Sequence, residues 1–170
     1  AMEESLRMRK AYPEINFGLE TTAGHLLLHH EAPLGIPDAY AKVNPPIRSR
    51  ADREYLWEKV LDGTVEWTIT DHANCPRDLK VDREEPENIW KARAGFGGIE
   101  YLLPGIYSEG TKRGLPLQRI AQLLAWNPAQ RFGPAQVAGM PDRPVVGQRS
   151  DEGVRDVGRG DRRHHHRAFC

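Results

Sequence analysis

Apolar residues recur at helical spacing over residues 49–63, which read SRADREYLWEKVLDG. Leu56, Val60 and Leu61 fall on one face with Tyr55 and Trp57 beside it, as in a helix that packs one side against a core. The stretch opens on a serine, which is a favourable N-cap, and closes on a glycine, which suits the C′ position. The pattern therefore predicts a helix here, and it is the clearest one in the chain.

Alternating β-branched and aromatic residues mark two candidate strands. Residues 64–70 read TVEWTIT and residues 15–22 read INFGLETT, and both patterns are typical of strands. Residues 2–12 carry apolar positions among charges and stop at a proline, which indicates the end of an exposed helix. Residues 98–114 and 115–133 have helical spacing and predict two further helices.

A long loop follows each candidate strand. Residues 30–50 hold four prolines, so regular structure cannot run through them, and residues 71–98 form the second loop. Loops of this length in compact domains are usually functional or disordered. Strands that alternate with helices predict an α/β fold with parallel strands. Because two strands cannot bury a sheet, the pattern indicates one end of a larger unit.

The composition narrows the classes of function. The 170 residues include 24 Lys and Arg, 24 Asp and Glu, and 39% hydrophobic residues. A net charge of zero gives no reason to expect nucleic acid or an anionic membrane as partner, and no apolar run approaches the ~20 residues that cross a bilayer. The first residues are charged and form no signal peptide, and the two cysteines lack metal-type spacing. We expect a cytoplasmic protein.

Residues 134–170 have a different composition, with no Leu, Ile or Lys and many Arg and Gly residues. So little apolar surface cannot offset the entropy of ordering, and we expect this tail to be disordered. A GC-rich gene translated out of frame would give the same composition, and both explanations stay open. The three adjacent histidines near its end indicate a solvated polar tract rather than a metal site. We place the domain boundary after Gly133, with residues 1–133 as the folded part.

Five short motifs follow one another along residues 1–133. They are ETTAGHLLL at 20–28, KVNPPIR at 42–48, LDGTV at 61–65 followed by TDHA at 70–73, ARAGFGGIE at 92–100, and NPAQRFG at 127–133. Any one motif alone is weak, but five in the right order are specific. Together they resemble the cyclic amidohydrolases, a family that includes dihydroorotases, allantoinases, hydantoinases and dihydropyrimidinases.

The resemblance implies a partial (β/α)8 TIM-type barrel of a metal-dependent hydrolase. It covers only the C-terminal part of such an enzyme, the last two strands with the helices that follow them. A whole barrel of this type needs ~250 residues. The family's His-x-His, carboxylated lysine and two later metal histidines have no counterpart here. We therefore expect a fragment of a hydrolase that, at full length, holds a divalent metal, as two zinc ions, and forms a homo-oligomer.

Asp71 is the candidate metal ligand and catalytic residue. The resemblance places it at the end of the eighth strand, and catalytic groups of such barrels lie at the C-terminal ends of strands. A carboxylate there suits a divalent ion and, beside a metal-bound water, can act as general base. The alternative is an ordinary turn or N-cap acid, because aspartate is common where strands end.

Three residues are candidates for substrate binding. Asn44 resembles the family's substrate-binding asparagine, whose amide offers both a donor and an acceptor to a cyclic imide or ureide. Ala94 and Gly95 lie where relatives offer backbone groups to the substrate ring, and a glycine permits close approach of the backbone. The alternatives are a turn asparagine before proline and a flexible loop glycine.

The nearby histidines are expected to serve the structure rather than the chemistry. His72 follows Asp71, so on a strand its side chain points the opposite way, and we expect an orienting or packing role. His25 matches a family histidine without a role that the sequence assigns. For His29 and His30, as for His25, no ligand role is expected.

The substrate is expected to be a small cyclic amide or ureide of the hydantoin, allantoin or dihydropyrimidine type. Cys75 stands where dihydroorotases of this resemblance carry a second histidine, which argues against dihydroorotate, and residues 71–80 are closest to allantoinases. Asn44 is nevertheless the dihydroorotase-like choice, so the individual substrate stays open. Two other interpretations also stay open, a non-catalytic scaffold related to the family and an inactive truncated product.

Overall fold

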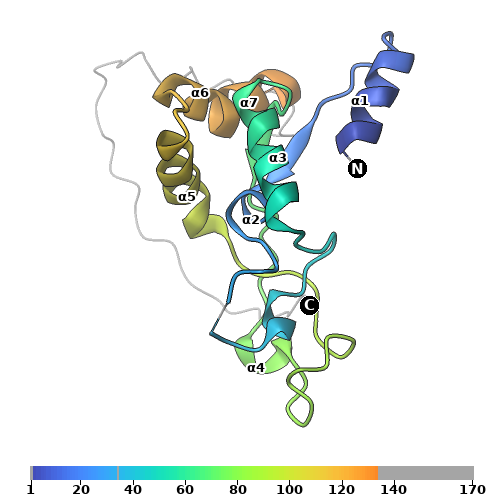
Figure 1. Cartoon of the computed structure of the whole chain (residues 1–170), viewed down its shortest axis with the longest axis vertical. Coiled ribbons are helices and arrows are strands. Elements are labelled where there is room, and N and C mark those ends of the chain that lie inside the picture. The colour runs from blue at the N-terminus through green and yellow to red at the C-terminus, as the bar shows by residue number, and fades with distance from the viewer. Residues whose placement is uncertain (1, 34, 134–170) are drawn as a thin grey trace, which may run out of the picture.

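The computed structural model describes residues 2–33 and 35–133, and it shows a mixed α/β arrangement with helices around two short strands (Figure 1). Expectations about the tail therefore lie outside the described residues. No helix in the described ranges is long and apolar enough to cross a membrane. The helical elements are α1 Met2–Ala11, α2 Ala23–Leu27, the 3-10 turn η1 Asp38–Ala41, α3 Arg50–Leu61, α4 Arg77–Lys80, α5 Ile99–Lys112, α6 Leu117–Ala121, the π-helical turn η2 Gln122–Trp126 and α7 Asn127–Phe132.

The strands β1 (Glu20–Thr22) and β2 (Trp67–Ile69) pair in parallel, with Glu20 opposite Trp67. This confirms the parallel α/β prediction, but both strands are shorter than the pattern predicted. The backbone before β1 lies instead under a tryptophan ring: a Cβ added to Gly18 would lie 2.2 Å from Cη2 of Trp67. Close packing on this ring, together with the Glu66 N–H donating to the Leu19 carbonyl at 2.8 Å, holds that part of the chain.

Helix α3 begins where its sequence predicts. The Ser49 hydroxyl accepts from the Asp52 N–H at 3.1 Å, and the Asp52 carboxylate accepts from the Ser49 N–H at 3.3 Å, which makes a capping box. Gly63 follows the helix at φ +86°, as its C′ position requires. The inward face differs from the prediction, because Leu61 is 44% exposed while Trp57 is 1% exposed.

The predicted helix over residues 115–133 is interrupted by the π-helical turn η2. Pro128 lies at the start of α7 and has no N–H to donate one helical turn back. Just before it, the Asn127 N–H donates to the carbonyl of Gln122, five residues earlier. The chain thus stays helical through Pro128, but by way of a π-helical turn that the spacing of apolar residues did not predict.

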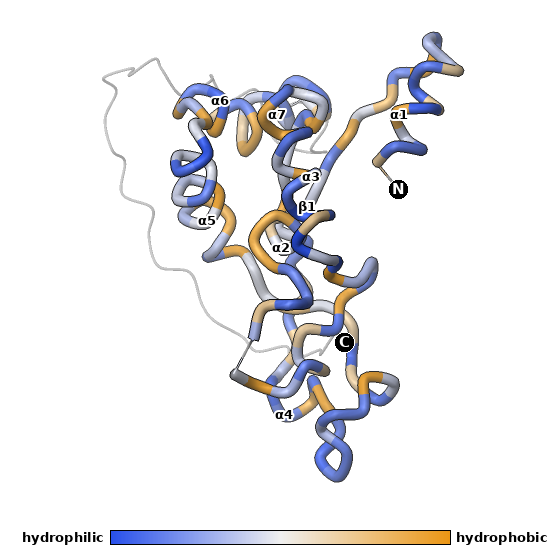
Figure 2. Tube along the Cα trace, viewed as in Figure 1, coloured by the Kyte–Doolittle hydropathy of each residue, from blue (hydrophilic) through white to orange (hydrophobic). Residues whose placement is uncertain are grey.

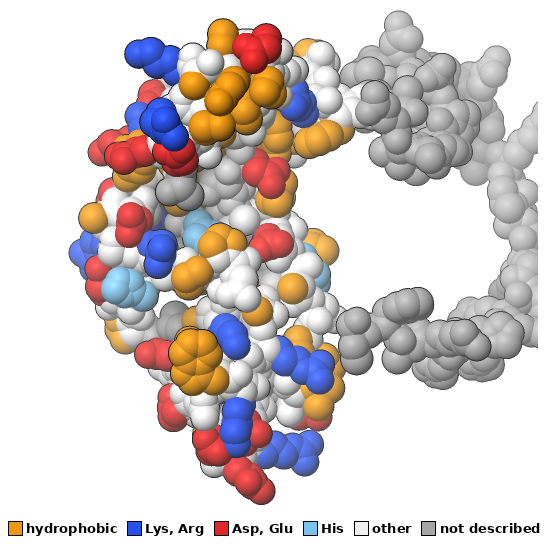
Figure 3. Space-filling model, turned by 90° about the vertical axis from the view of Figure 1, so that its right-hand side faces the viewer, with side chains coloured by type: hydrophobic (Ala, Val, Ile, Leu, Met, Phe, Trp, Pro, Cys, Tyr) orange, Lys and Arg blue, Asp and Glu red, His pale blue; other side chains and the backbone are white. Residues whose placement is uncertain are grey.

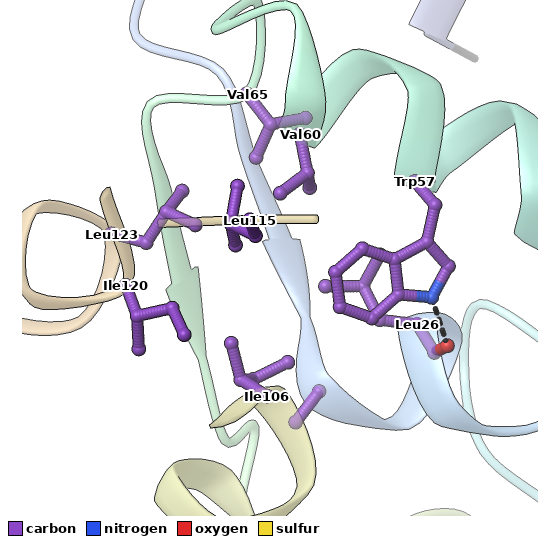
Figure 4. Close-up of a cluster of buried hydrophobic side chains, with 9 residues drawn as sticks. Leu26, Trp57, Val60, Val65, Ile106, Leu115, Ile120 and Leu123 are labelled. Carbon is purple, nitrogen blue, oxygen red and sulfur yellow. Dashed lines mark hydrogen bonds between the residues drawn. The ribbon is translucent and has the colours of Figure 1, made fainter. Parts of the chain in front are cut away.

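The core lies between α2, α3, α5 and the α6–α7 segment. Figure 4 shows its side chains converging, with the Trp57 Nε1–H donating to the Leu26 carbonyl at 2.8 Å. Helix α2, which contributes Leu26, is the apolar stretch drawn in orange in Figure 2. The buried cluster comprises Ala23, Leu26, Trp57, Val60, Val65, Ile106, Leu115, Ile120 and Leu123.

Large apolar side chains also lie at the surface of the described residues. On α5, Ile99, Leu103 and Tyr107 are spaced four residues apart and are more than half exposed. Figure 3 draws the side of the molecule away from α5, where other hydrophobic side chains gather at one end. Exposed apolar side chains along one helix face, as on α5, typically mark a contact surface.

Candidate functional site

Asp71 follows β2 in a left-handed backbone conformation with φ +50°. Among the described residues it is the single non-glycine residue with positive φ, a conformation that aspartate tolerates better than most side chains. Its side chain is exposed, and its carboxylate has no hydrogen-bond or ion-pair partner within residues 2–33 and 35–133. The turn is held instead by the Thr70 hydroxyl, which accepts from the His72 N–H at 3.2 Å. The carboxylate is therefore not used as a turn or cap acceptor.

His72 joins the end of β2 to the start of α5. Its Nδ1 accepts from the backbone N–H groups of Gly98 at 3.1 Å and Ile99 at 3.3 Å. These are donors that a helix start leaves without intrahelical partners, and Gly98 has no side chain that could cap them. Because Nδ1 accepts, the ring proton resides on Nε2. The expected orienting role of His72 is confirmed, as the cap of a helix.

Gly95 packs against the turn that follows Asp71. The Ala73 N–H donates to the Phe96 carbonyl at 3.1 Å, which ties the two loops together. Gly95 has φ +94°, and a Cβ there would lie 2.5 Å from the Cβ of Ala73. Both the backbone conformation and the close approach require glycine at this position.

The loop that carries Asn44 is joined to the same place. The Gly95 N–H donates to the Lys42 carbonyl at 2.9 Å, two residues before Asn44. Asn44 itself is exposed and precedes a cis peptide bond to Pro45. Three segments that are far apart in the sequence, residues 42–44, 71–73 and 93–96, are thus bonded to one another, and they contain every residue that the sequence proposed for the site.

His25 connects the Asn44 loop to the end of β1. Its Nε2 donates to the Pro45 carbonyl at 3.1 Å, because a carbonyl can only accept. Its Nδ1 then accepts from the Thr22 hydroxyl at 2.7 Å, while that hydroxyl accepts from the His25 N–H. His29 is buried and bonds to Glu31 at 2.9 Å. The sequence assigned no role to His25, and the structure shows it supporting the loop beside Asn44.

Sequence reasoning missed two lysines. Lys42 extends its Nζ to the carbonyls of Ile89 at 2.9 Å and Ala92 at 2.7 Å. Lys80 is buried, 5% exposed, and its Nζ donates to three backbone carbonyls in the loops around the site. Burial lowers the pKa of Lys80 from its ordinary value. Lys42 lies inside a motif of the resemblance, but no periodicity signals such a contact in advance.

Fewer of the described residues are candidates for metal ligation than for substrate binding. The part of the chain that the structure describes contains no group of three or more His, Cys, Asp or Glu side chains placed to hold an ion. Asp71 offers one free carboxylate, which suits a single ligand to a hard divalent cation. A site with three or more such ligands would therefore need side chains from outside residues 2–33 and 35–133.

Comparison with known proteins finds allantoinases, dihydroorotases and hydantoinases. No family model matches the chain. It is 42% identical over 122 residues to an allantoinase of Rubrobacter xylanophilus, which covers 71% of this chain and 26% of that protein. It is 37% identical over 140 residues to a dihydroorotase of a Geobacillus species, which covers 81% of this chain and 30% of the relative.

Solved structures give the same grouping. The L-hydantoinase (dihydropyrimidinase) of Arthrobacter aurescens superposes with a TM-score of 0.65 at 27% identity, over 78% of this chain and 29% of that one. A D-hydantoinase superposes with a TM-score of 0.63 at 26% identity, over 75% and 28%. The chain spans less than a third of the length of the relatives that it matches.

Proposed function

The chain belongs to the cyclic amidohydrolase family, of whose members it matches one part, and from this premise we propose that it contributes to a hydrolase of a C–N bond in a small cyclic amide or ureide. The relatives are named as allantoinases, dihydroorotases and hydantoinases, which share that kind of reaction. The observation that carries the proposal is the joining, by backbone hydrogen bonds, of three loops, one of which carries Asp71 with its free carboxylate. The proposed substrate, of the hydantoin, allantoin or dihydropyrimidine type, would bind where these loops meet.

The proposed fold of the complete catalytic unit is a (β/α)8 barrel, to which this chain contributes the last two strands. Parallel pairing of β1 and β2 supports it, as do loops with polar groups at the ends of both strands. The apolar stripe on α5 supports it too, because in a barrel such a helix face packs against neighbouring elements. The full-length protein is also proposed to form a homo-oligomer.

Asp71 is proposed as one ligand of a divalent metal site, with two zinc ions as the expected content. A bound ion supplies a Lewis acid and lowers the pKa of its water when it is present. In this chain, the Asp71 carboxylate is free to accept a proton and later to return it to the ring nitrogen that leaves. Its backbone turn is fixed by Thr70 rather than by its own side chain, so the carboxylate keeps all its lone pairs for that work.

Substrate binding is proposed for the two loops beside Asp71. The Asn44 amide can donate to a ring carbonyl and accept from a ring N–H. Gly95 already uses its N–H on Lys42 and its carbonyl on Lys80, whereas both backbone groups of Ala94 are without partners among the described residues. Ala94 is therefore proposed to bond to the ring, while Gly95 allows the close approach of the loops.

A chimera tests the proposal. In it, the matching 122 residues of the Rubrobacter allantoinase are replaced by those of this chain, and metal content and hydrolysis of allantoin, hydantoin and dihydrouracil are measured. We expect bound metal and hydrolysis of a cyclic ureide, with both lost in Asp71→Ala. Asp78→Ala, which changes an exposed acid on α4, is the matched control and should keep both.

One alternative function has an observation in its favour. The described residues hold a single candidate ligand and an exposed apolar stripe, which also suits a non-catalytic scaffold of this family. A folded chimera without metal or hydrolysis would contradict the enzyme proposal and favour the scaffold.

A further inference from the structure

Lys80 is a buried cation without a carboxylate partner in the described part of the chain. It lies at the end of α4, 5% exposed, and its ammonium group donates to the carbonyls of Lys42 at 2.9 Å, Arg93 at 2.6 Å and Gly95. All three of its protons are thereby used. No carboxylate among the described residues forms an ion pair with it.

Such an arrangement costs free energy. A buried charge loses its hydration and is normally paired with an opposite charge. Here burial lowers the pKa of the ammonium, while the three carbonyl dipoles and the nearby Cys75 favour its charged form. An apolar side chain of similar volume would avoid that cost but would leave the three carbonyls without this donor, so the bonds that the ammonium makes account for a lysine at this position.

The three carbonyls show what the ammonium group does. The Lys42 carbonyl belongs to the loop of Asn44, and the Arg93 and Gly95 carbonyls flank Ala94. The Lys42 carbonyl accepts from Lys80 and from the Gly95 N–H at once, so both of its lone pairs are used. One atom, Nζ of Lys80, thus sets the distance between the loop of Asn44 and the loop of Ala94, the two edges proposed to bind the substrate ring.

We propose that Lys80 is a positioning residue for the substrate: it does not touch the ring, but fixes the Asn44 edge relative to the Ala94 edge. This rests on the proposed function of those loops. A rigid spacing between two hydrogen-bonding edges is what discriminates one planar cyclic amide from another, because a misplacement of about 1 Å can cost about 100-fold in reactivity. Lys42 supports the same loops from the other side through Ile89 and Ala92.

The test compares Lys80→Met, Lys80→Gln and a control, Lys91→Met, which removes an exposed lysine that pairs with Glu85. In the chimera, Lys80→Met should raise KM for the ureide by roughly tenfold or more and leave metal content at the unmodified level. Lys80→Gln keeps N–H donors and should raise KM less. Lys91→Met should leave KM unchanged.

A second measurement separates this proposal from the proposed function. In the 170-residue chain, the Gly95 amide, which donates to Lys42, should exchange its hydrogen at least tenfold faster in Lys80→Met or Lys80→Gln, while buried α3 amides keep their rates. If the chimera hydrolyses nothing, the proposed function fails and the exchange rates still decide the role of Lys80. Unchanged KM with unchanged Gly95 exchange overturns the positioning role. A loss of α3 protection as well would show a merely structural role and overturn it too.

Discussion

Around Trp57 the chain is held by apolar contact, whereas around Lys80 it is held by hydrogen bonds to backbone carbonyls. In the first region, Trp57, Val60 and Leu123 are at most 1% exposed, and one hydrogen bond serves the tryptophan. In the second, most side chains of residues 71–98 are exposed, and two lysines and a histidine supply the bonds.

The difference teaches where each region is vulnerable. Apolar contacts are numerous and non-directional, so a core responds to lost volume. Hydrogen bonds from a single ammonium group are few and directional, so the loops respond to small displacements. The proposed site lies in the second region, where geometry rather than buried area decides whether the edges meet.

Trp57→Ala should change the free energy of unfolding most, because it disrupts the apolar core. Truncating a fully buried tryptophan leaves a cavity and removes the bond to Leu26, so the free energy of unfolding should fall by about 3–5 kcal/mol. Urea unfolding followed by circular dichroism measures this. Trp90→Ala, at an 89% exposed position, should change the value by less than about 0.5 kcal/mol. Equal losses in the two variants would contradict the assignment of the core.

Gly95→Ala should cause the second-largest loss of stability, because it disrupts the hydrogen-bonded loops. The new Cβ would lie 2.5 Å from the Cβ of Ala73, and the alanine would have to adopt φ +94°. Steric overlap would therefore add to backbone strain. We expect a loss of about 2–4 kcal/mol in urea unfolding. Gly114→Ala is the matched control, because Gly114 has φ +83° with no atom within 4 Å and should lose only about 1–2 kcal/mol. A Gly95 effect no larger than that of Gly114 would disprove the close approach.

The ion pair of Glu54, at the periphery of the core, predicts a dependence of stability on pH. Hydrogen bonds from Arg113, whose guanidinium also lies 4.9 Å from the Trp57 ring centre, and then from Arg53, lower the pKa of Glu54 from 4.5 to about 2. Its contribution is therefore fully present above pH 4.5 and is lost as the pH falls toward 2. Since the carboxylate is 38% exposed, the contribution is about 0.2–1 kcal/mol.

Urea unfolding of wild type and Glu54→Gln across pH 2 to 7 measures that contribution. The difference between the two proteins should shrink below pH 4.5, whereas Glu87→Gln, at an exposed loop position, should show no such trend. A difference independent of pH would mean that packing of the side chain, not its charge, stabilises the helix.

Asp71→Gly should have the smallest effect on stability, with the opposite sign. Glycine adopts φ +50° at no steric cost, and the carboxylate has no partner to lose, so the free energy of unfolding should rise by about 0.5 kcal/mol. Asp78→Gly, within the helical turn α4, should instead lower it by about 1 kcal/mol. A clear destabilisation by Asp71→Gly would mean that the aspartate serves the turn and not the proposed chemistry.

Local patterns predicted much of the fold. The capping box and the glycine after α3 are short-range signals, because the groups that satisfy each other lie within a few residues. Strand ends were harder to predict, because the packing of Gly18 on Trp67 involves residues far apart in the sequence. The site residues were proposed from motifs, and their roles stay proposals, but the structure brings their loops together.

The sequence by itself determined the start of α3, the parallel order of the strands and which loops carry polar groups, since propensity and spacing act over a few residues. Only the tertiary structure decided what His25, Lys42 and Lys80 do, because their partners are backbone carbonyls up to 50 residues away. A carbonyl is present at every position, so no residue type marks the one that will be bound. Which carbonyl meets which side chain follows from the fold alone.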